Sequence, residues 1–138
     1  MTSFVLDNSV VLAWCMADEN HPLADYALRR ATSGRAFVPG IWWYELRNAL
    51  LVNERRGRLG IAETAATLGA VARLRVSIDA DHHEQRVLDL ARRRRVTVYD
   101  AAYLEVALRR ALPLATLDRR LRDAAAASGV PLLSEPGA

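Results

Sequence analysis

Short apolar runs alternate with longer stretches of helix-forming residues along the sequence. The apolar runs cover residues 4–6, 36–39, 75–78, 96–98, 114–117 and 131–133. The helical stretches cover residues 9–16, 22–32, 41–56, 62–73, 82–95, 101–110 and 119–128. Strands that alternate with helices in this way pair in parallel, because each helix carries the chain back to the edge where the next strand starts. We therefore expect an α/β fold with a central parallel sheet of about five short strands, flanked by helices on both faces.

Length and composition favour a single globular domain over residues 1–138. Hydrophobic residues make up 51% of the chain and charged residues 25%, and mean hydropathy is −0.01. A chain of this length buries most of the surface that its unfolded form exposes. No run of about 18 apolar residues is present, so we expect no membrane span. The single cysteine, Cys15, rules out an internal disulfide, and together with an N-terminus that lacks a leader it indicates a cytoplasmic protein.

The basic residues narrow the possible functions. The formal net charge is +3, and every one of the 19 basic residues is arginine. A P-loop requires a lysine, receiver domains use one beside their phosphorylated aspartate, and Schiff-base chemistry requires an amine. The absence of lysine therefore excludes these three common functions of α/β proteins.

Three aspartates follow the ends of apolar runs and precede helical stretches. They are Asp7, Asp100 and Asp118. Each alone is explained by helix capping, in which the carboxylate accepts backbone N–H groups of the first turn. Parallel strands, however, end along one edge of a sheet, where ligand sites of α/β folds lie. The three aspartates are thus also candidates for one shared site.

A fourth acid, Glu45, lies inside the helical stretch 41–56, where no capping role explains it. It shares a stripe of 3.6-residue period with Ile41, Asn48, Ala49 and Val52. A buried carboxylate is costly unless a cation or a proton neutralises it. A salt bridge to one of the arginines is the alternative to a metal ion.

Four short motifs recur in the same order in a known family. They are D-x-S at Asp7–Ser9, E-x-x-N at Glu45–Asn48, Y-D-A-A-Y at 99–103 and A-T-L-D-x-x-L at 115–121. The sequence resembles PIN-domain proteins and, among them, the VapC toxins of bacterial type II toxin–antitoxin systems. The resemblance spans nearly the whole chain and implies a single PIN domain. Asn8 departs mildly from the small residue common in the family at that position.

The resemblance implies a Mg²⁺- or Mn²⁺-dependent ribonuclease, a hydrolase, with Asp7, Glu45, Asp100 and Asp118 as catalytic and metal-binding residues. Carboxylates without neighbouring cysteine or histidine suit such hard cations, which activate water and stabilise charge on a scissile phosphate. Whether one or two ions bind stays open. The resemblance also makes Ser9, Asn48 and Thr116 candidates for orienting the carboxylates or a bound water. For the two hydroxyls, local hydrogen bonds to the backbone are the alternative.

The expected partners are an RNA substrate, a second copy of the chain and a cognate antitoxin. Arg119 and Arg120 directly follow Asp118 and are the first candidates for phosphate contact. Most other arginine pairs lie near predicted helix C-termini, where the helix dipole favours cations. The resemblance implies the homodimer and an antitoxin whose C-terminal segment crosses the active-site groove, often placing a basic residue in the acidic pocket.

Other functions are weighed against this hypothesis. A haloacid dehalogenase-type phosphatase needs a second aspartate two residues after the first, where this chain has Ser9. A non-catalytic PIN-like module that binds RNA or protein has no chemical need for four acids. A DNA-directed nuclease stays open, because a carboxylate–metal site does not itself read a 2′-hydroxyl.

Several conspicuous residues receive structural interpretations instead. Asp79 and Asp81 precede the helical stretch 82–95 and are assigned to helix capping. Tyr103, like the other large aromatic residues, is assigned to the core or to a protein interface.

Overall fold

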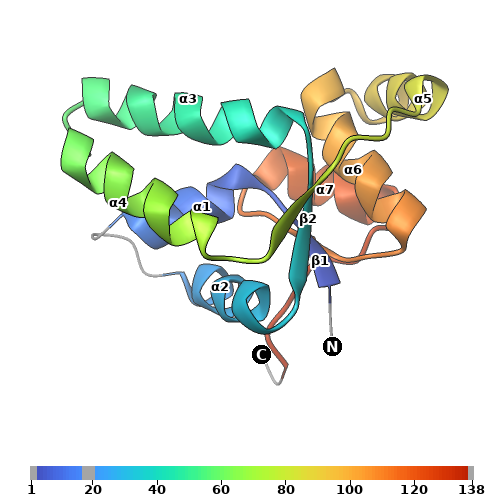
Figure 1. Cartoon of the computed structure of the whole chain (residues 1–138). Coiled ribbons are helices and arrows are strands. Elements are labelled where there is room, and N and C mark those ends of the chain that lie inside the picture. Colours follow the sequence, from blue (N-terminus) through green and yellow to red (C-terminus); the bar gives the residue numbers. More distant parts are fainter. Residues whose placement is uncertain (1–2, 17–20, 137–138) are drawn as a thin grey trace.

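The computed structural model describes residues 3–16 and 21–136 (Figure 1). Its strands are β1 (Ser3–Leu6), β2 (Arg35–Pro39), β3 (Val76–Asp79) and β4 (Leu114–Ala115). Its helices are α1 (Asn8–Cys15), α2 (Pro22–Ser33), α3 (Ile41–Arg55), α4 (Ile61–Ala72), α5 (Glu84–Arg94), α6 (Val98–Arg110) and α7 (Arg119–Ala127). The alternation of strands and helices expected from the sequence is confirmed.

The strands form one parallel sheet in the order β3-β2-β1-β4. Beyond β4, Leu132 forms an isolated parallel bridge with Leu114, so the expected strand at 131–133 is reduced to a single pairing. In Figure 1, α2 and the α3–α4 pair lie to the left of β2, and α5 and α6 lie to its right. The sheet is thus flanked by helices on both faces, as the sequence predicts.

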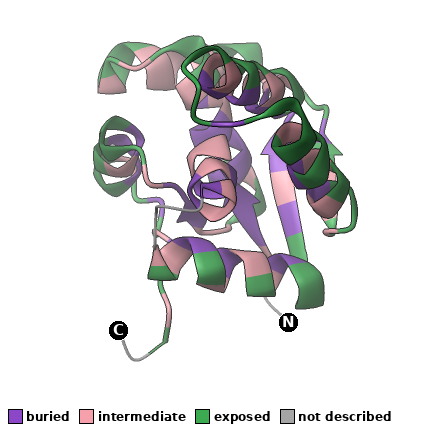
Figure 2. Cartoon of the chain, turned by 90° about the vertical axis from the view of Figure 1, so that its left-hand side faces the viewer, coloured by how far each residue is buried: buried purple, intermediate pink, exposed green. Residues whose placement is uncertain are grey.

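The core lies between the sheet and these helices. Phe4, Val5 and Leu114 are fully buried, as strands covered on both faces require. Figure 2 shows mostly buried strands at the centre and exposed faces on the surrounding helices. Burying each Leu, Val or Phe side chain contributes about 1.5–3 kcal/mol, so the core holds the carboxyl edge of the sheet in place. No helix in the described part of the chain is long and apolar enough to cross a membrane.

The structure corrects the expectation of an extended segment at residues 96–98. Val98 is already the first residue of α6, and Thr97 is its N-cap. The Thr97 hydroxyl oxygen accepts a hydrogen bond of 3.0 Å from the backbone N–H of Asp100. This capping bond satisfies an otherwise unpaired amide of the first turn, and it overrides the β propensity of the two valines.

The capping role expected for Asp79 is also wrong. Asp79 ends β3, is 5% exposed, and accepts hydrogen bonds from Arg109 Nη1 at 2.9 Å and Arg110 Nε at 2.6 Å. The N-cap position of the following helix, α5, is His83, whose side chain makes no capping hydrogen bond. Asp79 therefore ties the edge strand β3 to the C-terminal end of α6.

Candidate active site

The site lies where the chain changes direction across the sheet. From β1 the chain runs to β2 and β3 on one side, and it returns to β4 on the other side. The crevice between β1 and β4 is thus the topological switch point, at the carboxyl ends of the strands. The backbone N–H of Asp7, just after β1, donates to the carbonyl of Ala115, the last residue of β4, at 3.0 Å.

Asp7 occupies the centre of this crevice and is only 6% exposed. It is the N-cap residue of α1, but its side chain makes no capping hydrogen bond there. Its Oδ2 instead accepts hydrogen bonds from Ser9 Oγ at 2.7 Å and Thr116 Oγ1 at 2.8 Å. Burial raises the pKa of Asp7, the two hydroxyls oppose that rise, and the negative charge of Asp118 adds to it.

The hydroxyl groups of Ser9 and Thr116 each act both as a hydrogen-bond donor and as an acceptor. A hydroxyl has one proton to donate, and Ser9 and Thr116 each direct it at Asp7. As acceptors, Ser9 Oγ takes the N–H of Leu117 at 2.9 Å, and Thr116 Oγ1 takes that of Asp118 at 3.1 Å. Thr116 therefore combines both roles considered from the sequence, since it holds a carboxylate and bonds to local backbone. The backbone bond of Ser9 is not local, because Leu117 lies 108 positions further along the chain.

Asp100 is not an N-cap, because Thr97 fills that position and Asp100 lies three residues further on. The capping alternative is therefore wrong for Asp100. Its carboxylate is half-buried on the first turn of α6. Burial raises its pKa, the charges of Asp118 and Asp7 raise it further, and the nearby Arg120 lowers it.

Asp118 is both a cap and a member of the cluster. It precedes α7, and its Oδ1 accepts the backbone N–H groups of Arg120 at 2.9 Å and Leu121 at 3.3 Å. Its charge acts on both Asp7 and Asp100. The capping bonds fix the direction of this carboxylate and use only one of its oxygens.

Glu45 reaches the cluster from α3. Its Oε1 accepts a hydrogen bond of 2.7 Å from the hydroxyl of Tyr103, on α6. Burial raises the pKa of Glu45, the Tyr103 hydroxyl lowers it, and the charges of Asp7 and Asp100 raise it. No arginine within residues 3–16 and 21–136 forms an ion pair with Glu45, so the salt-bridge alternative is wrong for that part of the chain.

The helical stripe proposed around Glu45 needs correction. The buried positions of α3 are Trp42, Leu46, Leu50 and Asn53. Asn48 is exposed, and its side chain makes no hydrogen bond to another described residue, Glu45 included. Glu45 stands at the border of the buried stripe, and Asn48 faces solvent one turn further on.

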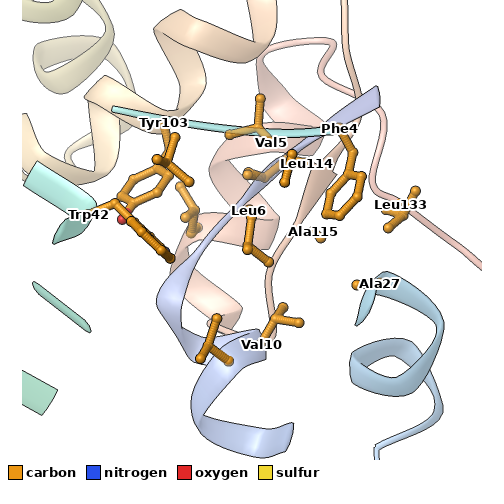
Figure 3. Packing of buried hydrophobic residues seen from close by; sticks show 14 of the residues in the cluster. Phe4, Val5, Leu6, Val10, Ala27, Trp42, Tyr103, Leu114, Ala115 and Leu133 are labelled. Atoms are coloured by element: carbon orange, nitrogen blue, oxygen red, sulfur yellow. The ribbon is translucent and has the colours of Figure 1, made fainter. Parts of the chain in front are cut away.

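Tyr103 is the site residue that sequence reasoning missed. It is fully buried and, in Figure 3, belongs to the same apolar cluster as Trp42, Val5 and Leu6. Assignment to the core was therefore correct for its ring, but its hydroxyl serves Glu45. The spacing from Asp100 was the available signal, because residues three apart lie on one face of a helix.

The donor set of this crevice fits a divalent hard cation. The four acids supply only oxygen ligands, and burial and mutual repulsion raise the pKa values of Asp7, Glu45 and Asp100. A bound cation would offset both the burial of these carboxylates and their mutual repulsion. No three Asp, Glu, His or Cys side chains of the described residues surround a single point closely enough to hold an ion by themselves. Mg²⁺ takes one or two carboxylates directly and keeps several waters, so it needs no such cage.

The fold and the sequence together define the class of protein. Residues 4–127 match the family model described as PIN domain. The match covers most of the chain, which therefore belongs to the PIN-domain family, as its motifs indicate. Members of this family are typically metal-dependent nucleases.

Three solved structures are similar to this chain. PAE2754 from Pyrobaculum aerophilum shares 27% identity with a TM-score of 0.68, over 89% of this chain and 79% of the other. A toxin–antitoxin complex from Klebsiella pneumoniae shares 16% identity with a TM-score of 0.58, over 83% and 86%. FitAcB from Neisseria gonorrhoeae shares 14% identity with a TM-score of 0.62, over 95% and 96%. No protein with curated function matches the sequence.

Proposed function

We propose that this chain is a Mg²⁺- or Mn²⁺-dependent endoribonuclease and the toxin of a toxin–antitoxin pair. The observation that carries the proposal is the convergence of Asp7, Glu45, Asp100 and Asp118 at the switch point of a PIN fold. Two of these carboxylates are oriented by neutral hydroxyl groups, which leave their negative charge in place. A site built only to stabilise the fold has no use for such uncompensated charge.

The protein residues have distinct tasks in this proposal. Asp7, Glu45, Asp100 and Asp118 are the catalytic residues that would hold the metal. When bound, the ion supplies an activated water and stabilises the charge that develops on the scissile phosphate. Ser9 and Thr116 keep the Asp7 carboxylate in one orientation, and Tyr103 does the same for Glu45. Such preorganisation avoids the cost of turning side chains during the reaction.

Two arginines support a nucleic acid as the substrate. Arg119 and Arg120 open α7, where the positive end of the helix dipole disfavours cations, and they are exposed. Because Arg119 and Arg120 do not stabilise α7 at this position, contact with the phosphate groups of a substrate is the function that we assign to them. The family resemblance favours RNA over DNA.

Protein partners complete the proposal. An apolar groove of about 500 Å³ lies between the start of α3, α5 and α6. Tyr44, 67% exposed, and Tyr99, 56% exposed, are among its lining residues, and each precedes a site acid, Glu45 or Asp100, in the chain. Exposed aromatic side chains are enriched at protein interfaces. We assign this groove to a second copy of the chain, and the acidic crevice to the basic residue of an antitoxin segment.

The test of the proposed reaction is cleavage of a labelled single-stranded RNA by the purified protein. We expect cleavage with Mg²⁺ or Mn²⁺, none in excess EDTA, and loss of cleavage in Asp7→Asn, Glu45→Gln, Asp100→Asn and Asp118→Asn. The four acids act as one unit, so combining substitutions should add little to the loss from one. Asp25→Asn, an exposed acid on α2, is the matched control and should cleave normally.

Several outcomes would count against this function. Full cleavage in EDTA, or by two of the four variants, excludes the metal-nuclease mechanism. A DNA strand of the same sequence serves as the competitor, and its preferential cleavage would identify a DNA-directed nuclease instead. Binding of RNA without cleavage would support a non-catalytic PIN-like module.

A further inference from the structure

A positively charged surface adjoins the acidic crevice. Arg93 and Arg94, from the last turn of α5, and Arg119 and Arg120, from the first turn of α7, line one concave region of about 600 Å³. We call this region the arginine groove. Among the residues that the structure describes, Asp123 is the only acid that lines it. Two helices that are distant in sequence thus place four guanidinium groups around one depression.

Helix stability does not explain this arrangement. Arg93 and Arg94 lie at a helix C-terminus, where the dipole favours cations, but Arg119 and Arg120 lie at an N-terminus, where it disfavours them. The N-cap residue Asp118 offsets part of this cost, and the first turn of α7 contains no further acid. The helix dipole therefore does not account for Arg119 and Arg120 as it does for Arg93 and Arg94.

Several arginines outside the groove are paired within the protein. Arg29 pairs with Glu135, Arg92 with Asp89, and Arg109 with both Glu105 and Asp79. Within the described residues, the side chains of Arg93, Arg119 and Arg120 form no ion pair or hydrogen bond. Arg94 is held by a hydrogen bond of 2.9 Å from its Nε to Ser128 Oγ. Three of the four guanidinium groups are thus available to an external anion.

The groove lies beside the acidic crevice. Asp118 immediately precedes Arg119, and its carboxylate accepts the backbone N–H of Arg120. The charge of Arg120 acts in turn on Asp100. An anion in the groove therefore lies next to the proposed site of cleavage.

We propose that the arginine groove binds the phosphates of the RNA strand on one side of the scissile bond, so that Arg93 of α5 is a substrate-binding residue. This inference rests on the proposed function and adds the path of the substrate to it. Guanidinium groups bind phosphate oxygens through paired hydrogen bonds, and groups from two helices suit a chain of repeated phosphates. An acidic protein segment is a weaker candidate, because only a substrate has to continue from the groove into the crevice.

The experiment measures RNA binding and its salt dependence in the Asp7→Asn background, without divalent metal, so that cleavage plays no part. Arg93→Gln removes an exposed charge while keeping a long polar side chain. Each lost phosphate contact should lower the slope of log affinity against log salt concentration by about 0.7 for a single strand. We expect this loss for Arg93→Gln, and about twice this loss for Arg93→Gln/Arg119→Gln.

Arg92→Gln is the matched control. Arg92 is the neighbour of Arg93, is exposed on the same helix turn and pairs with Asp89, but it does not line the groove. Its substitution should leave the slope unchanged, and thermal melting should show that all variants are folded. For a dinucleotide, which is too short to occupy crevice and groove together, Arg93→Gln should also make no difference.

The outcomes separate this inference from the proposed function. If the protein with an intact Asp7 cleaves RNA but Arg93→Gln does not change the salt slope, the groove does not bind the substrate. The proposed nuclease function then still holds. A changed slope in a protein that cuts no RNA supports the groove and overturns the nuclease. If Arg92→Gln and Arg93→Gln lower the salt slope equally, RNA is attracted by the general positive charge of the protein. The proposed role of the groove is then wrong. Displacement of RNA by polyglutamate at lower concentration than by unlabelled RNA assigns the groove to an acidic protein segment.

Discussion

At the scale of single residues, the site is distinguished by how its acids are held. Asp79, outside the site, is held by two arginines, whereas Asp7 is held by two hydroxyls and Glu45 by one. A guanidinium group orients a carboxylate and neutralises it, but a hydroxyl only orients it. In a chain with 19 arginines, holding these acids by hydroxyl groups keeps negative charge at the proposed cation site.

Repulsion among the four acids leads to a prediction for stability. Asp100→Asn removes one charge from the cluster, while capping of α6 by Thr97 is unaffected. In EDTA we expect the variant to be as stable as the wild type or more stable. For the wild type, Mn²⁺ at about a hundred times its Kd should add about 2.7 kcal/mol to the free energy of unfolding, and the variant should gain much less.

Thermal melting with and without Mn²⁺ measures both effects. Asp25→Asn, remote from the site, is the control and should respond to Mn²⁺ like the wild type. If Asp100→Asn melts below the wild type in EDTA and gains as much from Mn²⁺, Asp100 is a structural residue.

The sequence located the four acids but not all of their surroundings. Asp7 and Asp118 were accessible because each follows a run that ends near the carboxyl edge of the sheet, whereas the run before Asp100 leads into α6 and is not a strand. The orientation of α3 was not predicted, because the expected stripe was drawn through Glu45 and Asn48, whereas the buried stripe contains the more apolar residues Trp42, Leu46 and Leu50. The same buried stripe ends in Asn53, whose Nδ2 bonds to the carbonyl of Ala49.

At the scale of elements, hydrogen bonds at the ends of helices and strands override local propensity. Residues 96–98 have the composition of a strand, yet the Thr97 cap turns them into the start of α6. The edge strand β3 ends in Asp79, whose partners Arg109 and Arg110 lie thirty residues or more along the chain. Capping patterns are local and readable from sequence, but ion pairs over such separations are not.

The Asp79 network predicts how stability depends on pH. Burial alone would raise the pKa of Asp79, but hydrogen bonds from Arg109, Arg110 and the N–H of Asp81 lower it to about 2, from an ordinary value of 3.8. Because the folded-state pKa is depressed, the stabilisation is complete above pH 3.8 and is lost as the pH falls towards 2. The difference corresponds to about 2 kcal/mol.

Urea denaturation of the wild type and Asp79→Asn between pH 7 and pH 3 measures this contribution. The variant should be less stable by about 2 kcal/mol or more at pH 7, and the gap should narrow below pH 4. Asp89→Asn removes a partly exposed ion pair on α5 and should cost under about 1 kcal/mol. A gap that stays constant down to pH 3 would show that the charge of Asp79 is not the source of its effect.

At the scale of the whole molecule, alternation in the sequence predicts a parallel sheet but not its strand order. The order follows from pairing of the two-residue strand β4 with Val5 and Leu6. Such a short strand carries little pattern of its own, so its neighbour is decided by packing of the complete core. The acids therefore indicated the carboxyl edge of the sheet as the place of the site, and the strand order shows that this place is the switch point between β1 and β4.

The apolar groove predicts the oligomeric state. Sedimentation velocity of the purified chain should show a dimer, and Tyr99→Ser should shift it towards the monomer, because an exposed aromatic contact is lost. Ile61→Ser, at an exposed apolar position of α4 outside the groove, is the control and should remain dimeric. A wild-type monomer at every concentration tested would contradict the homodimer, and an unchanged dimer in Tyr99→Ser would move its interface elsewhere.

The hydrogen bond from Thr116 to Asp7 spans 109 positions of the chain. A ribosome synthesises Asp7 long before Thr116, so the crevice cannot close until 109 further residues have been added. An unfinished copy that ends before Leu114 lacks both the strand β4 and the fourth acid, Asp118. For an enzyme that would cut RNA in the cell that makes it, the order of synthesis postpones activity until this part of the site has been made.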